Sequence, residues 1–461
     1  MESIIGLEVH VSLDTKTKLF CSCPLTGSEE PNSRCCEICT GFPGSKPAVN
    51  KKAIGYALKL CLALNCSISP EVIFSRKTYF YPDMGKNFQI TQYEMPIGSD
   101  GFLELKNKKV RIRRIQIEED PAALVHQGNT VLVDYNRSGT PLCEIVTEPD
   151  MQNPEEAREF LKKLLTILNY IKIFDIKTGI IKADANVNIK GCERVEIKNI
   201  NGFKDIERAI IYELERQRHL IKDSKPITQK ETRGWDSEKG ITLFQRSKES
   251  EEDYGYIIEP DLVPVEIKKD FIEKTKKELP EMPEKKALRY QKDFRIKKDD
   301  AEVIANDYEL TKLLEEAVNK KINPLFAAEW IRREVTRVLN YSKKDLDETF
   351  IAKNLIDVLS LIQNNRIIRQ AGQKLMELLV EKDLNAKDYV KKQNLETVSD
   401  TKEIEEICKK VIKENQKAVK EYIEGNEKSF MFIVGKVMYA TKGKADPKVV
   451  NETLKKLIKN L

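Results

Sequence analysis

The hydrophobic pattern of the chain changes once, at the proline-rich and charged stretch KKELPEMPEKKALRY, which covers residues 276–290. Before this stretch, short alternating runs mix with isolated helical segments and most of the glycine, cysteine and proline residues, which is typical of an α+β fold. After it, the pattern is almost continuously helical, as in AAEWIRREVTRVLN and LIDVLSLIQ. We interpret the stretch itself as a linker.

The length and the helical breaks divide the chain further. A chain of 461 residues is too long for a single hydrophobic core. Breaks fall near Asn364 and in NLETVSDT. We predict an α+β domain over residues 1–290, a helical domain over 291–398 and a small helical tail over 399–461.

The composition is that of a folded globular protein, with 40% hydrophobic and 33% charged residues. The ten cysteines have no regular spacing and no secretory leader ahead of them, so a disulfide framework is not expected. The N-terminus lacks the basic and apolar regions of a signal peptide, and no run of about 18 apolar residues occurs. We therefore expect a cytoplasmic protein that does not enter a membrane.

One helix can be placed from its sequence signals alone. Asn153 can cap it, Pro154 suits its first position, and the acidic pair that follows suits the helix dipole. Apolar residues then recur at helical spacing from Ala157 to Leu168. We expect this helix to pack against the core and to carry no chemistry.

Two cysteine pairs predict a structural zinc site. Cys21 and Cys23 are separated by one residue, and Cys36 and Cys39 by two, with a short loop between the pairs. Four thiolates complete tetrahedral Zn²⁺ without leaving an open position, so such a site holds structure and performs no catalysis. Cys35 is an alternative ligand to Cys36, and reduced thiols without metal are the alternative for the whole cluster.

Acidic side chains lie on the polar faces of several predicted strands. In LEVHV the apolar residues point one way and Glu8 and His10 the other. A second strand leads through Ile115 and Ile117 into three consecutive acids, Glu118, Glu119 and Asp120.

The segment KADANVNIKGCERVEIKNI supplies two further polar faces, joined by a turn at Gly191. They carry Asp184, Asn186 and Asn188 on the first strand, and Arg194, Glu196 and Lys198 on the second. Oxygen ligands with at most one imidazole suit Mg²⁺ or Mn²⁺ better than Zn²⁺. Solvated outer strand faces are the alternative, because alternation alone does not bring four segments together.

Two basic regions suggest a polyanionic partner. In RKTYFYPD, residues 76–83, aromatic rings can stack on a base or ribose while Lys77 meets a phosphate or carboxylate, although core packing of the rings is equally compatible. The C-terminal end carries an excess of lysines that favours nucleic acid, with a solvated helix face as the alternative. These lysines are Lys428, Lys436, Lys442, Lys444, Lys448, Lys455, Lys456 and Lys459.

No familiar nucleotide or hydrolase motif occurs in the sequence. It contains no G-x-x-x-x-G-K-[ST] loop, no G-x-G-x-x-G fingerprint and no G-x-S-x-G elbow. Any use of ATP must therefore depend on metal and positioning residues outside those loops.

The order of motifs resembles the B-subunit family of aspartyl/glutamyl-tRNA amidotransferases. The matching runs are GLEVH, the paired cysteines, GFPGSKPAVN, RKTYFYPDM, QIEED, VDYNRSGTPLCEIVTEPD, KADANVNI, VEIKNINGF, ETRGWD and EPDL. FIVGKVMYATKGKADPKVVN resembles the YqeY-like tail of that family. Two departures stand out. DYGYIIEPDL lacks the arginine and Phe-Pro step of many relatives, and Glu37 replaces a proline.

The resemblance implies a cradle-like catalytic domain, a helical domain and a YqeY-like tail, working as part of a ligase heterotrimer. The partner amidase, the A subunit, releases ammonia from glutamine, and a small C subunit braces the pair. The B subunit uses ATP and Mg²⁺, or Mn²⁺ in its place, to phosphorylate the side-chain carboxylate of Asp-tRNA(Asn) or Glu-tRNA(Gln), which ammonia then amidates. Sequence does not separate the two substrates.

The resemblance also assigns residues to roles. The metal and catalytic site carries over to Glu8, His10, Glu118, Glu119, Asp184 and Glu196. Lys77 and Glu119 resemble the pair at the mouth of the ammonia channel. Substrate or nucleotide contacts are expected from Lys77, Tyr79, Tyr81, Lys198 and Asn199, and tRNA contacts from Lys428, Lys436, Lys442, Lys444 and Lys448.

Three rival functions fit part of this pattern. The related E-type protein acts on glutamyl-tRNA(Gln) alone, but it usually contains an inserted domain, for which this chain has no room. A non-catalytic tRNA-binding scaffold would account for the zinc site and the basic tail. A two-metal nuclease would use the same carboxylates, although their spacing does not favour phosphodiester cleavage.

Overall fold

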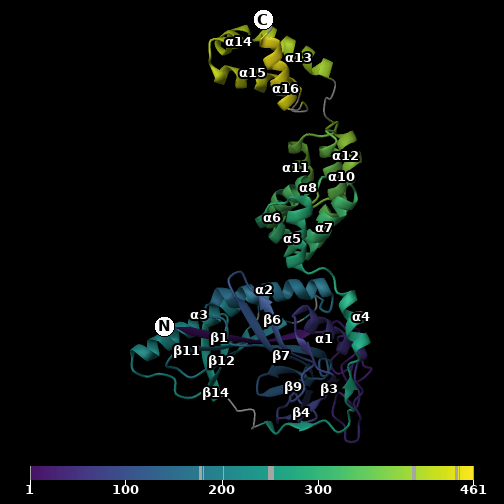
Figure 1. Ribbon diagram of the computed structural model, residues 1–461, viewed down its shortest axis with the longest axis vertical. Helices are drawn as coiled ribbons and strands as arrows, with labels where there is room; N and C mark the ends of the chain where they lie inside the picture. Colours follow the sequence, from purple (N-terminus) through teal and green to yellow (C-terminus); the bar gives the residue numbers. More distant parts are fainter. Residues whose placement is uncertain are drawn as a thin grey trace. The chain divides into compact units, whose positions relative to one another are not determined.

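The computed structural model describes residues 2–175, 179, 181–200, 202–247, 254–396, 401–441, 445 and 447–459, without the side chains at 203, 401–403 and 447–448. The chain forms two compact units, Met1–Met282 and Pro283–Leu461 (Figure 1). The first unit combines sheets with helices and the second is helical. The predicted fold class, an α+β part followed by a helical part, is confirmed.

The strands of the first unit are β1 (Ser3–Ser12), β2 (Ser67–Ile68), β3 (Glu71–Val72), β4 (Ser75–Thr78), β5 (Phe88–Thr91), β6 (Gly98–Glu104), β7 (Lys109–Glu119), β8 (Ala123–Gln127), β9 (Thr130–Asp134), β10 (Pro141–Thr147), β11 (Ile181–Ile189), β12 (Val195–Ile200), β13 (Glu231–Asp236), β14 (Ile241–Ser247), β15 (Ile257–Ile258) and β16 (Val265–Glu266). Its helices are α1 (Lys51–Ala63), α2 (Pro154–Ile171), α3 (Phe203–Lys222) and α4 (Lys269–Glu278).

A large sheet organises the first unit, with the strand order β14-β13-β12-β11-β1-β10-β7-β6-β2 among the described residues. Neighbouring strands are antiparallel except β12 and β13, which run parallel. β1 lies at the centre and pairs with both β10 and β11. The N-terminal strand β1 therefore brings together segments that are far apart in the sequence.

Alternation along β1 separates an apolar face of this sheet from a polar one. Ile5, Leu7, Val9 and Val11 are buried on the first face. Helices α1 and α3 pack on that face and α2 packs against both of them; Figure 1 shows α2 and α3 lying along the sheet. Because one face is sealed by helices, the polar residues of β1 must collect on the other.

The helix predicted from residue 154 is confirmed as α2. The side chain of Asn153 accepts a hydrogen bond from the backbone N–H of Glu156, at 2.9 Å, and Pro154 occupies the first turn. The apolar stripe, including Phe160 and Leu164, is buried in the core of the first unit. The cap, the proline and the stripe together define the start and the packing face of α2.

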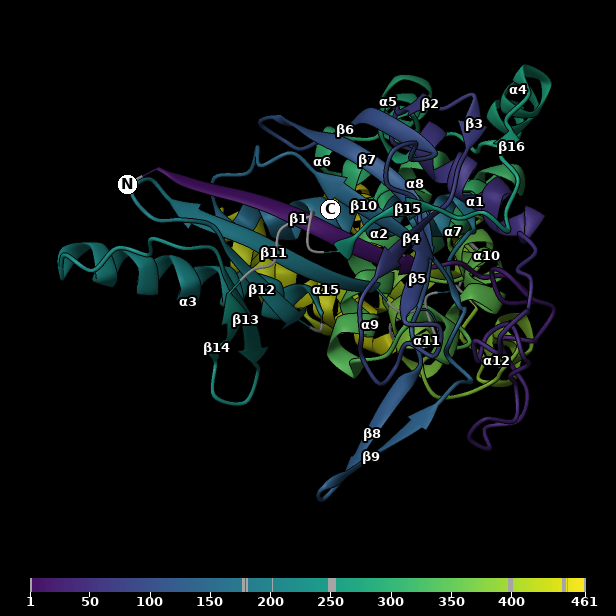
Figure 2. The same cartoon turned by 90° about the horizontal axis from the view of Figure 1, so that it is seen from below.

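Smaller sheets accompany the main sheet in the first unit. Strands β15, β4 and β5 form one sheet, and β3 pairs with β16. The segment after β5 lies on the main sheet, because the side-chain oxygen of Gln92 accepts the backbone N–H of Ile117 at 2.9 Å. β8 and β9 form a separate hairpin that projects outward from this unit (Figure 2).

The stretch predicted as a linker is mostly helical. α4 ends at Glu278, and the next helix begins at Pro283, so only residues 279–282 lie between them. Pro283 stands at a helix start, where its missing N–H costs nothing and its fixed φ suits the helix. The proline-rich composition indicated a break in the chain but not that the break is this short.

The second unit contains two apolar cores. The first is built by α5 (Pro283–Phe294), α6 (Lys298–Ala305), α7 (Tyr308–Asn319), α8 (Pro324–Trp330), α9 (Thr336–Ser342), α10 (Ile351–Gln363), α11 (Arg369–Leu378) and α12 (Ala386–Lys392). The second is built by α13 (Thr401–Glu414), α14 (Gln416–Ile423), α15 (Glu427–Ala440) and α16 (Pro447–Lys459). The predicted boundaries at 290 and 398 stay predictions. None of the described helices is both long and apolar enough to cross a membrane.

Candidate functional site

The register of the main sheet brings the predicted acidic segments onto one face. Glu8 on β1 lies opposite Asp184 on β11, and His10 lies opposite Glu144 on β10. Asn186 on β11 lies opposite Glu196 on β12, which carries the same face one strand further. Cross-strand partners point to the same side of a sheet, so these side chains share the polar face.

A first acidic group consists of Glu8, Asp184 and Glu196, each of which offers a carboxylate oxygen within 4.8 Å of the others. The ammonium of Lys198 lies 2.9 Å from Asp184 and 3.5 Å from Glu196. Asn186 donates from its amide to Glu8 at 2.9 Å. The group is thus held in place by partners on β11 and β12.

A second acidic group consists of His10, Glu118 and Glu144, with one ligand atom of each within 4.8 Å of the others. Nε2 of His10 lies 3.2 Å from Glu118, and the hydroxyl of Thr91 donates to the other oxygen of Glu118 at 3.2 Å. The amide of Gln116 donates to Glu144. Both glutamates are buried.

Burial and mutual repulsion perturb the second group. Burial and then the negative charge of Glu118 raise the pKa of Glu144 to about 7. Burial alone would lower the pKa of His10, but its hydrogen bond to Glu118 and the surrounding carboxylates outweigh burial and raise that pKa to about 9. The shift of Glu144 arises where like charges share one buried site, and the shift of His10 arises from the opposite charges around it; a cation bound there would relieve the repulsion between the carboxylates.

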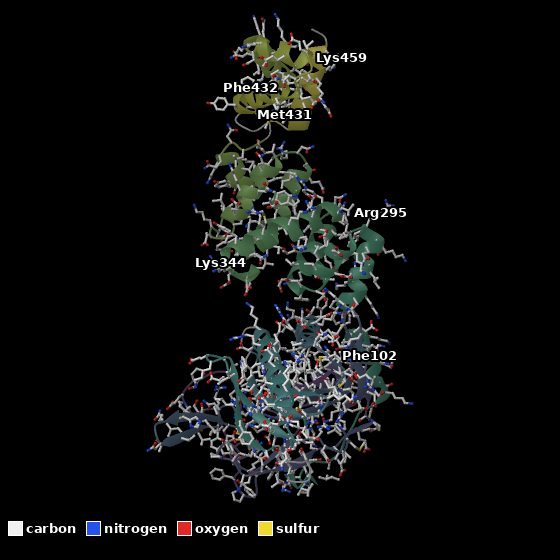
Figure 3. The ribbon with its side chains drawn as sticks, turned by 90° about the vertical axis from the view of Figure 1, so that its left-hand side faces the viewer. Phe102, Arg295, Lys344, Met431, Phe432 and Lys459 are labelled. Atoms are coloured by element: carbon white, nitrogen blue, oxygen red, sulfur yellow. The ribbon has the colours of Figure 1, made fainter. Side chains whose placement is uncertain are left out.

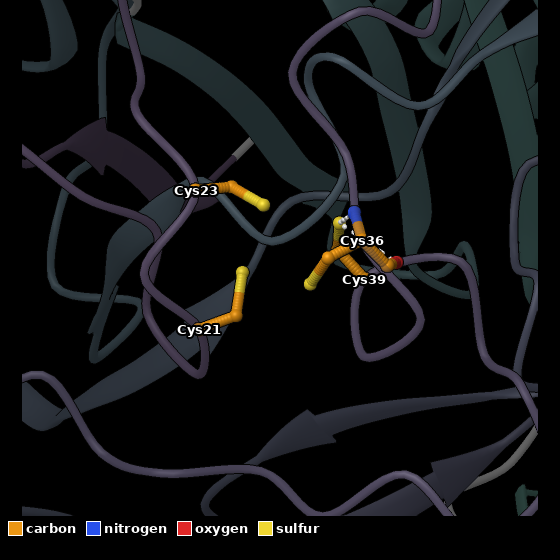
Figure 4. Close-up of side chains that lie close together, drawn as sticks. All are labelled: Cys21, Cys23, Cys36 and Cys39. Carbon is orange, nitrogen blue, oxygen red and sulfur yellow. Dashed lines mark hydrogen bonds between the residues drawn. The ribbon is translucent and has the colours of Figure 1, made fainter.

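The four predicted cysteines also form a group, with the sulfurs of Cys21, Cys23, Cys36 and Cys39 within 4.8 Å of one another (Figure 4). Cys35, by contrast, donates from its thiol to the carbonyl of Asn32 at 3.0 Å, and it is not part of the group within the described residues. The cluster can therefore hold a metal such as zinc through Cys36, not Cys35.

The surroundings of Cys39 favour a thiolate. The hydrogen bond from Cys21 lowers the pKa of Cys39 to about 5, against the effect of burial and with the help of the Cys36 backbone and Lys18. The ammonium of Lys18, which is fully buried, lies 3.4 Å from the sulfur of Cys39. A buried cation beside the cluster compensates the charge that several thiolates would bring.

Comparison with known proteins gives this architecture a family. The GatB/GatE catalytic domain matches residues 3–273, and the GatB domain matches residues 312–458. A relative from Thermodesulfovibrio yellowstonii is 42% identical over 99% of both chains. The chain belongs to the GatB/GatE family. The resemblance read from the motifs is confirmed.

Other relatives in the GatB/GatE family agree. A protein of Thermotoga maritima is 41% identical over 99% of this chain and 98% of its own length. One from Persephonella marina is 40% identical over 99% of both chains. Each of the three is named as the B subunit of an aspartyl/glutamyl-tRNA(Asn/Gln) amidotransferase.

One ligand candidate of this GatB/GatE chain was missed in the sequence, and one was misplaced. Glu144 lies in PLCEIVT, where all residues are buried, so no polar alternation marked it. Its one signal was a lone carboxylate in an apolar run. Within the described residues, Glu119 belongs to neither acidic group. It pairs with Lys86 and accepts the backbone N–H of Ile90 at 3.0 Å, because it is adjacent to Glu118 and points to the opposite side.

The predicted substrate residues of this GatB/GatE chain separate into two groups. Lys77 is half-buried. Burial opposes ionisation of Glu118, but the hydrogen bond and charge of His10, followed by the charge of Lys77, lower the pKa of Glu118. Burial, followed by the charge of Asp83, raises the pKa of the half-buried Tyr79. Tyr81, in contrast, is 58% exposed at the tip between β4 and β5. Tyr81 is therefore not part of the acidic site.

Asn199 also differs from the prediction. Lys198 points to the polar face, but the register between β11 and β12 shifts between Ala183 and Ala185, and Asn199 has a φ of +63°. The extra residue of this bulge leaves Asn199 exposed. The geometry therefore does not support a contact between Asn199 and the substrate. The sequence did not reveal this, because a bulge interrupts the alternation of side chains along a strand.

The predicted tRNA-binding lysines can be followed only in part. Lys428 and Lys436 on α15 are exposed, as is Lys459 on α16. Met431 and Phe432, which lie between the first two, are 64% and 51% exposed (Figure 3). Lys442 and Lys444, and the side chain of Lys448, lie outside the described residues.

Proposed function

We propose that the chain is the B subunit of a tRNA-dependent amidotransferase, which phosphorylates the side-chain carboxylate of Asp or Glu wrongly attached to tRNA. ATP is the phosphoryl donor, and ammonia from a partner amidase then completes the amide. The observation that carries the proposal is the pair of acidic groups, Glu8, Asp184 and Glu196 beside His10, Glu118 and Glu144, on one face of one sheet. The names of the relatives agree with it.

The donor set fits divalent cations. Five carboxylates and one imidazole make up the two groups, and Mg²⁺ and Mn²⁺ prefer oxygen ligands. Burial and then the charge of Glu118 raise the pKa of Glu144 to about 7, and a divalent cation there would offset both effects. The side-chain oxygen of Gln116 is buried beside it without a donor among the described residues. When bound, such cations neutralise phosphate oxygens and align the groups that react.

The residues of the chain orient the reactants. A carboxylate oxygen of the aminoacyl group attacks the γ-phosphorus of ATP, the bond from that phosphorus to the bridging oxygen breaks, and ADP leaves. Lys198 fixes Asp184 and Glu196 during this step. The ammonium of Lys77, close enough to influence Glu118, can meet the phosphate or the substrate carboxylate. Ammonia then forms the C–N bond as phosphate leaves.

Partners complete the proposed enzyme, a glutamine-hydrolysing carbon–nitrogen ligase of the cytoplasm. The amidase, or A subunit, supplies ammonia, and the small C subunit joins the heterotrimer. We assign Glu119 to the inlet for ammonia with Lys77, and its contact with Lys86 adds a second cation there. The cysteine cluster holds structural zinc. The exposed lysines of α15 and α16 contact the tRNA.

The test compares matched variants in the reconstituted complex, with aspartyl-tRNA and glutamyl-tRNA assayed separately. Glu118→Gln should lower ATP turnover that depends on misacylated tRNA by about 100-fold or more, since it removes a preorganised charge. The control Glu104→Gln changes an exposed carboxylate on β6 and should leave turnover unchanged.

The rival functions predict other outcomes. If the chain were a tRNA-binding scaffold, ATP turnover would be the same in the unsubstituted protein and in the Glu118→Gln variant. An E-type protein would amidate glutamyl-tRNA alone. A nuclease would shorten labelled tRNA in the presence of Mg²⁺ without ATP.

A further inference from the structure

A short segment with two tyrosines is fastened onto β4 at the edge of the acidic site. In β15, Ile257 and Ile258 pair with Arg76 and Ser75. The backbone N–H of Glu259 then donates to the carbonyl of Phe74 at 2.9 Å. Strand β15 is therefore the third strand of this sheet, on the side of β4 away from β5, and Tyr254 and Tyr256 lie directly before it although they are more than 160 residues further along the chain.

A buried ion pair fixes the register of this segment. Arg76 donates from Nε and Nη2 to the two oxygens of Glu259 at 2.7 and 2.8 Å. Glu259 is 1% exposed, and the guanidinium of Arg76 stacks 4.3 Å from the ring centre of Phe88. A bidentate pair in a buried position specifies geometry as well as energy, so the residues before Glu259 are held in one place.

Three tyrosine rings are gathered by this arrangement, and we call them the tyrosine platform. The rings of Tyr93 and Tyr256 stack with centres 4.1 Å apart and planes 10° apart. Tyr254 meets Tyr256 edge-on at 6.3 Å. Gly255, with a φ of +51°, separates the last two and adopts a backbone conformation that costs a glycine little. All three rings are half-buried and keep some surface in solvent.

The tyrosine platform is next to the acidic groups. The ammonium of Lys77 lies 4.6 Å from the ring centre of Tyr254, and its charge reaches both Glu118 and Glu144. Tyr93 follows Thr91 by two residues, and Thr91 donates its hydroxyl to Glu118. The site thus has aromatic rings on one side, which suit the base of a nucleotide. On the other side it has a cation and two carboxylates, which suit the phosphate end.

We propose that the tyrosine platform, Tyr93, Tyr254 and Tyr256, binds the adenine ring of an adenosine nucleotide whose phosphate end points toward Lys77 and the acidic groups. Aromatic side chains bind bases through stacking, and a cation beside the ring adds attraction for the phosphate. The proposal rests on the proposed function. Two sources supply adenosine there, ATP itself and the 3′-terminal nucleotide of the tRNA.

The exposed aromatic residues of the β4–β5 tip are weaker candidates. Phe80 and Tyr81 are 81% and 58% exposed, and the structure gives them no contact with Lys77 among the described residues. The platform differs in that a buried ion pair holds the segment of two of its rings, Tyr254 and Tyr256, in advance. Preorganised rings lose less freedom on binding, which favours them as the base site.

The experiment uses the complete complex and measures Kd for Mg-ATP and for deacylated tRNA with and without its terminal adenosine. Tyr93→Leu and Tyr256→Leu should weaken one adenosine source by roughly tenfold or more, as expected for one lost stacked base. Tyr93→Phe and Tyr256→Phe keep the ring and should stay within about twofold, since stacking needs no hydroxyl. The control Tyr341→Leu removes a tyrosine that is 91% exposed on α9.

The pattern of loss identifies the source. A weaker Kd for ATP with unchanged tRNA binding assigns the platform to ATP. A weaker Kd for intact tRNA, but not for tRNA lacking the terminal adenosine, assigns it to the tRNA end. Unchanged Kd values for both, or equal losses in the Phe and Leu variants, overturn the proposal.

A second measurement covers the case in which a Leu variant fails to fold. Tyr93→Trp keeps an aromatic ring at the platform and adds a fluorophore, which adenine stacking should quench. Ribose 5-phosphate, which has no base, should not quench it. Absence of quenching by both ATP and a CCA trinucleotide overturns the proposal. If it fails while Glu118→Gln still abolishes turnover, the proposed function stands without the platform.

Discussion

Glu144 is a buried carboxylate on which the charges of Glu118 and Glu8 act. It lies in a strand whose residues are all buried, opposite His10, and its pKa is raised to about 7 by burial and by Glu118. An anionic group held in such a place is stabilised by a bound cation. Ion binding at this group would therefore offset the repulsion between Glu118 and Glu144.

This predicts a metal-dependent stability that Glu144 controls. Adding Mn²⁺ should raise the Tm of the unsubstituted protein, because ligands that bind only the folded state stabilise it by mass action. Glu144→Gln keeps a side chain of the same shape beside Gln116 but loses the charge, so its Tm should respond far less. Calorimetry with chelator and with Mn²⁺ checks this. An equal response in both proteins would contradict the assignment of Glu144.

A second prediction concerns Lys86 and Glu119 at the proposed ammonia inlet. Their contact lies beside the second acidic group but outside it. Lys86→Met should reduce amidation driven by glutamine by about tenfold and spare amidation driven by high ammonium chloride, since dissolved ammonia bypasses the inlet. Product analysis with both nitrogen sources measures the ratio. Equal losses with both sources would place Lys86 in the chemistry instead.

Four of the six ligand candidates could be assigned to a polar strand face from alternation, and Glu118 from its place after an alternating run. Glu8, His10, Asp184 and Glu196 alternate with buried residues, so period two located them. That the strands are neighbours depends on long-range pairing, which periodicity does not contain. Glu144 escaped because a strand buried on both faces shows no alternation.

At the scale of elements, the cysteine loop acts as one unit with the strand ends beside it. The backbone N–H of Asn32 donates to Asp134 at 2.9 Å, and that of Arg34 donates to Asn136 at 2.7 Å. These hydrogen bonds therefore hold the cysteine loop against the end of β9 and the residues that follow it. Metal at its four sulfurs would fix both.

Zinc content should separate two neighbouring cysteines. Cys39→Ser removes a member of the sulfur group and should yield protein with little or no zinc. Cys35→Ser changes a thiol that bonds the Asn32 carbonyl instead, and it should retain one zinc per chain. Metal analysis of the purified proteins decides. Full zinc in the Cys39 variant, or loss in the Cys35 variant, would contradict the ligand set.

The cap of α2 offers a test of a local feature. Asn153→Ala deletes the acceptor for the Glu156 N–H and should lower the free energy of unfolding of the first unit by about 1 kcal/mol. Urea unfolding of this variant, followed by circular dichroism, measures the change. An unchanged midpoint would mean that packing alone fixes the start of α2. This helix was predictable because its signals are local, whereas the extent of the linker depended on the packing of α5.

At the scale of the whole molecule, the C-terminal lysines are proposed to bind tRNA through their positive charge. α15 and α16 share one apolar core with α13 and α14. Removing residues 428–461 would therefore expose that core as well as delete lysines. Charge-neutralising substitutions test the tail more cleanly than truncation.

Lys428→Gln with Lys436→Gln should weaken tRNA binding and reduce its dependence on salt by roughly one unit of logarithmic slope for each lost phosphate contact. The control Lys344→Gln with Lys353→Gln changes a half-buried and an exposed lysine of the other helical core, which pair with Glu381 and Asp383. Filter binding across a salt series gives both slopes. Equal slopes for the tail variant and the unsubstituted protein would show that these lysines do not contact the tRNA.

The proposed chemistry depends on cation binding at the acidic face of the sheet, and diffraction can test that binding directly. A crystal of the complex soaked in Mn²⁺ should show anomalous density among Glu8, Asp184 and Glu196 and among His10, Glu118 and Glu144. The density at the second group should vanish in the Glu144→Gln variant. Absence of density at both groups, in crystals whose complex still turns over ATP with Mn²⁺, would contradict the account.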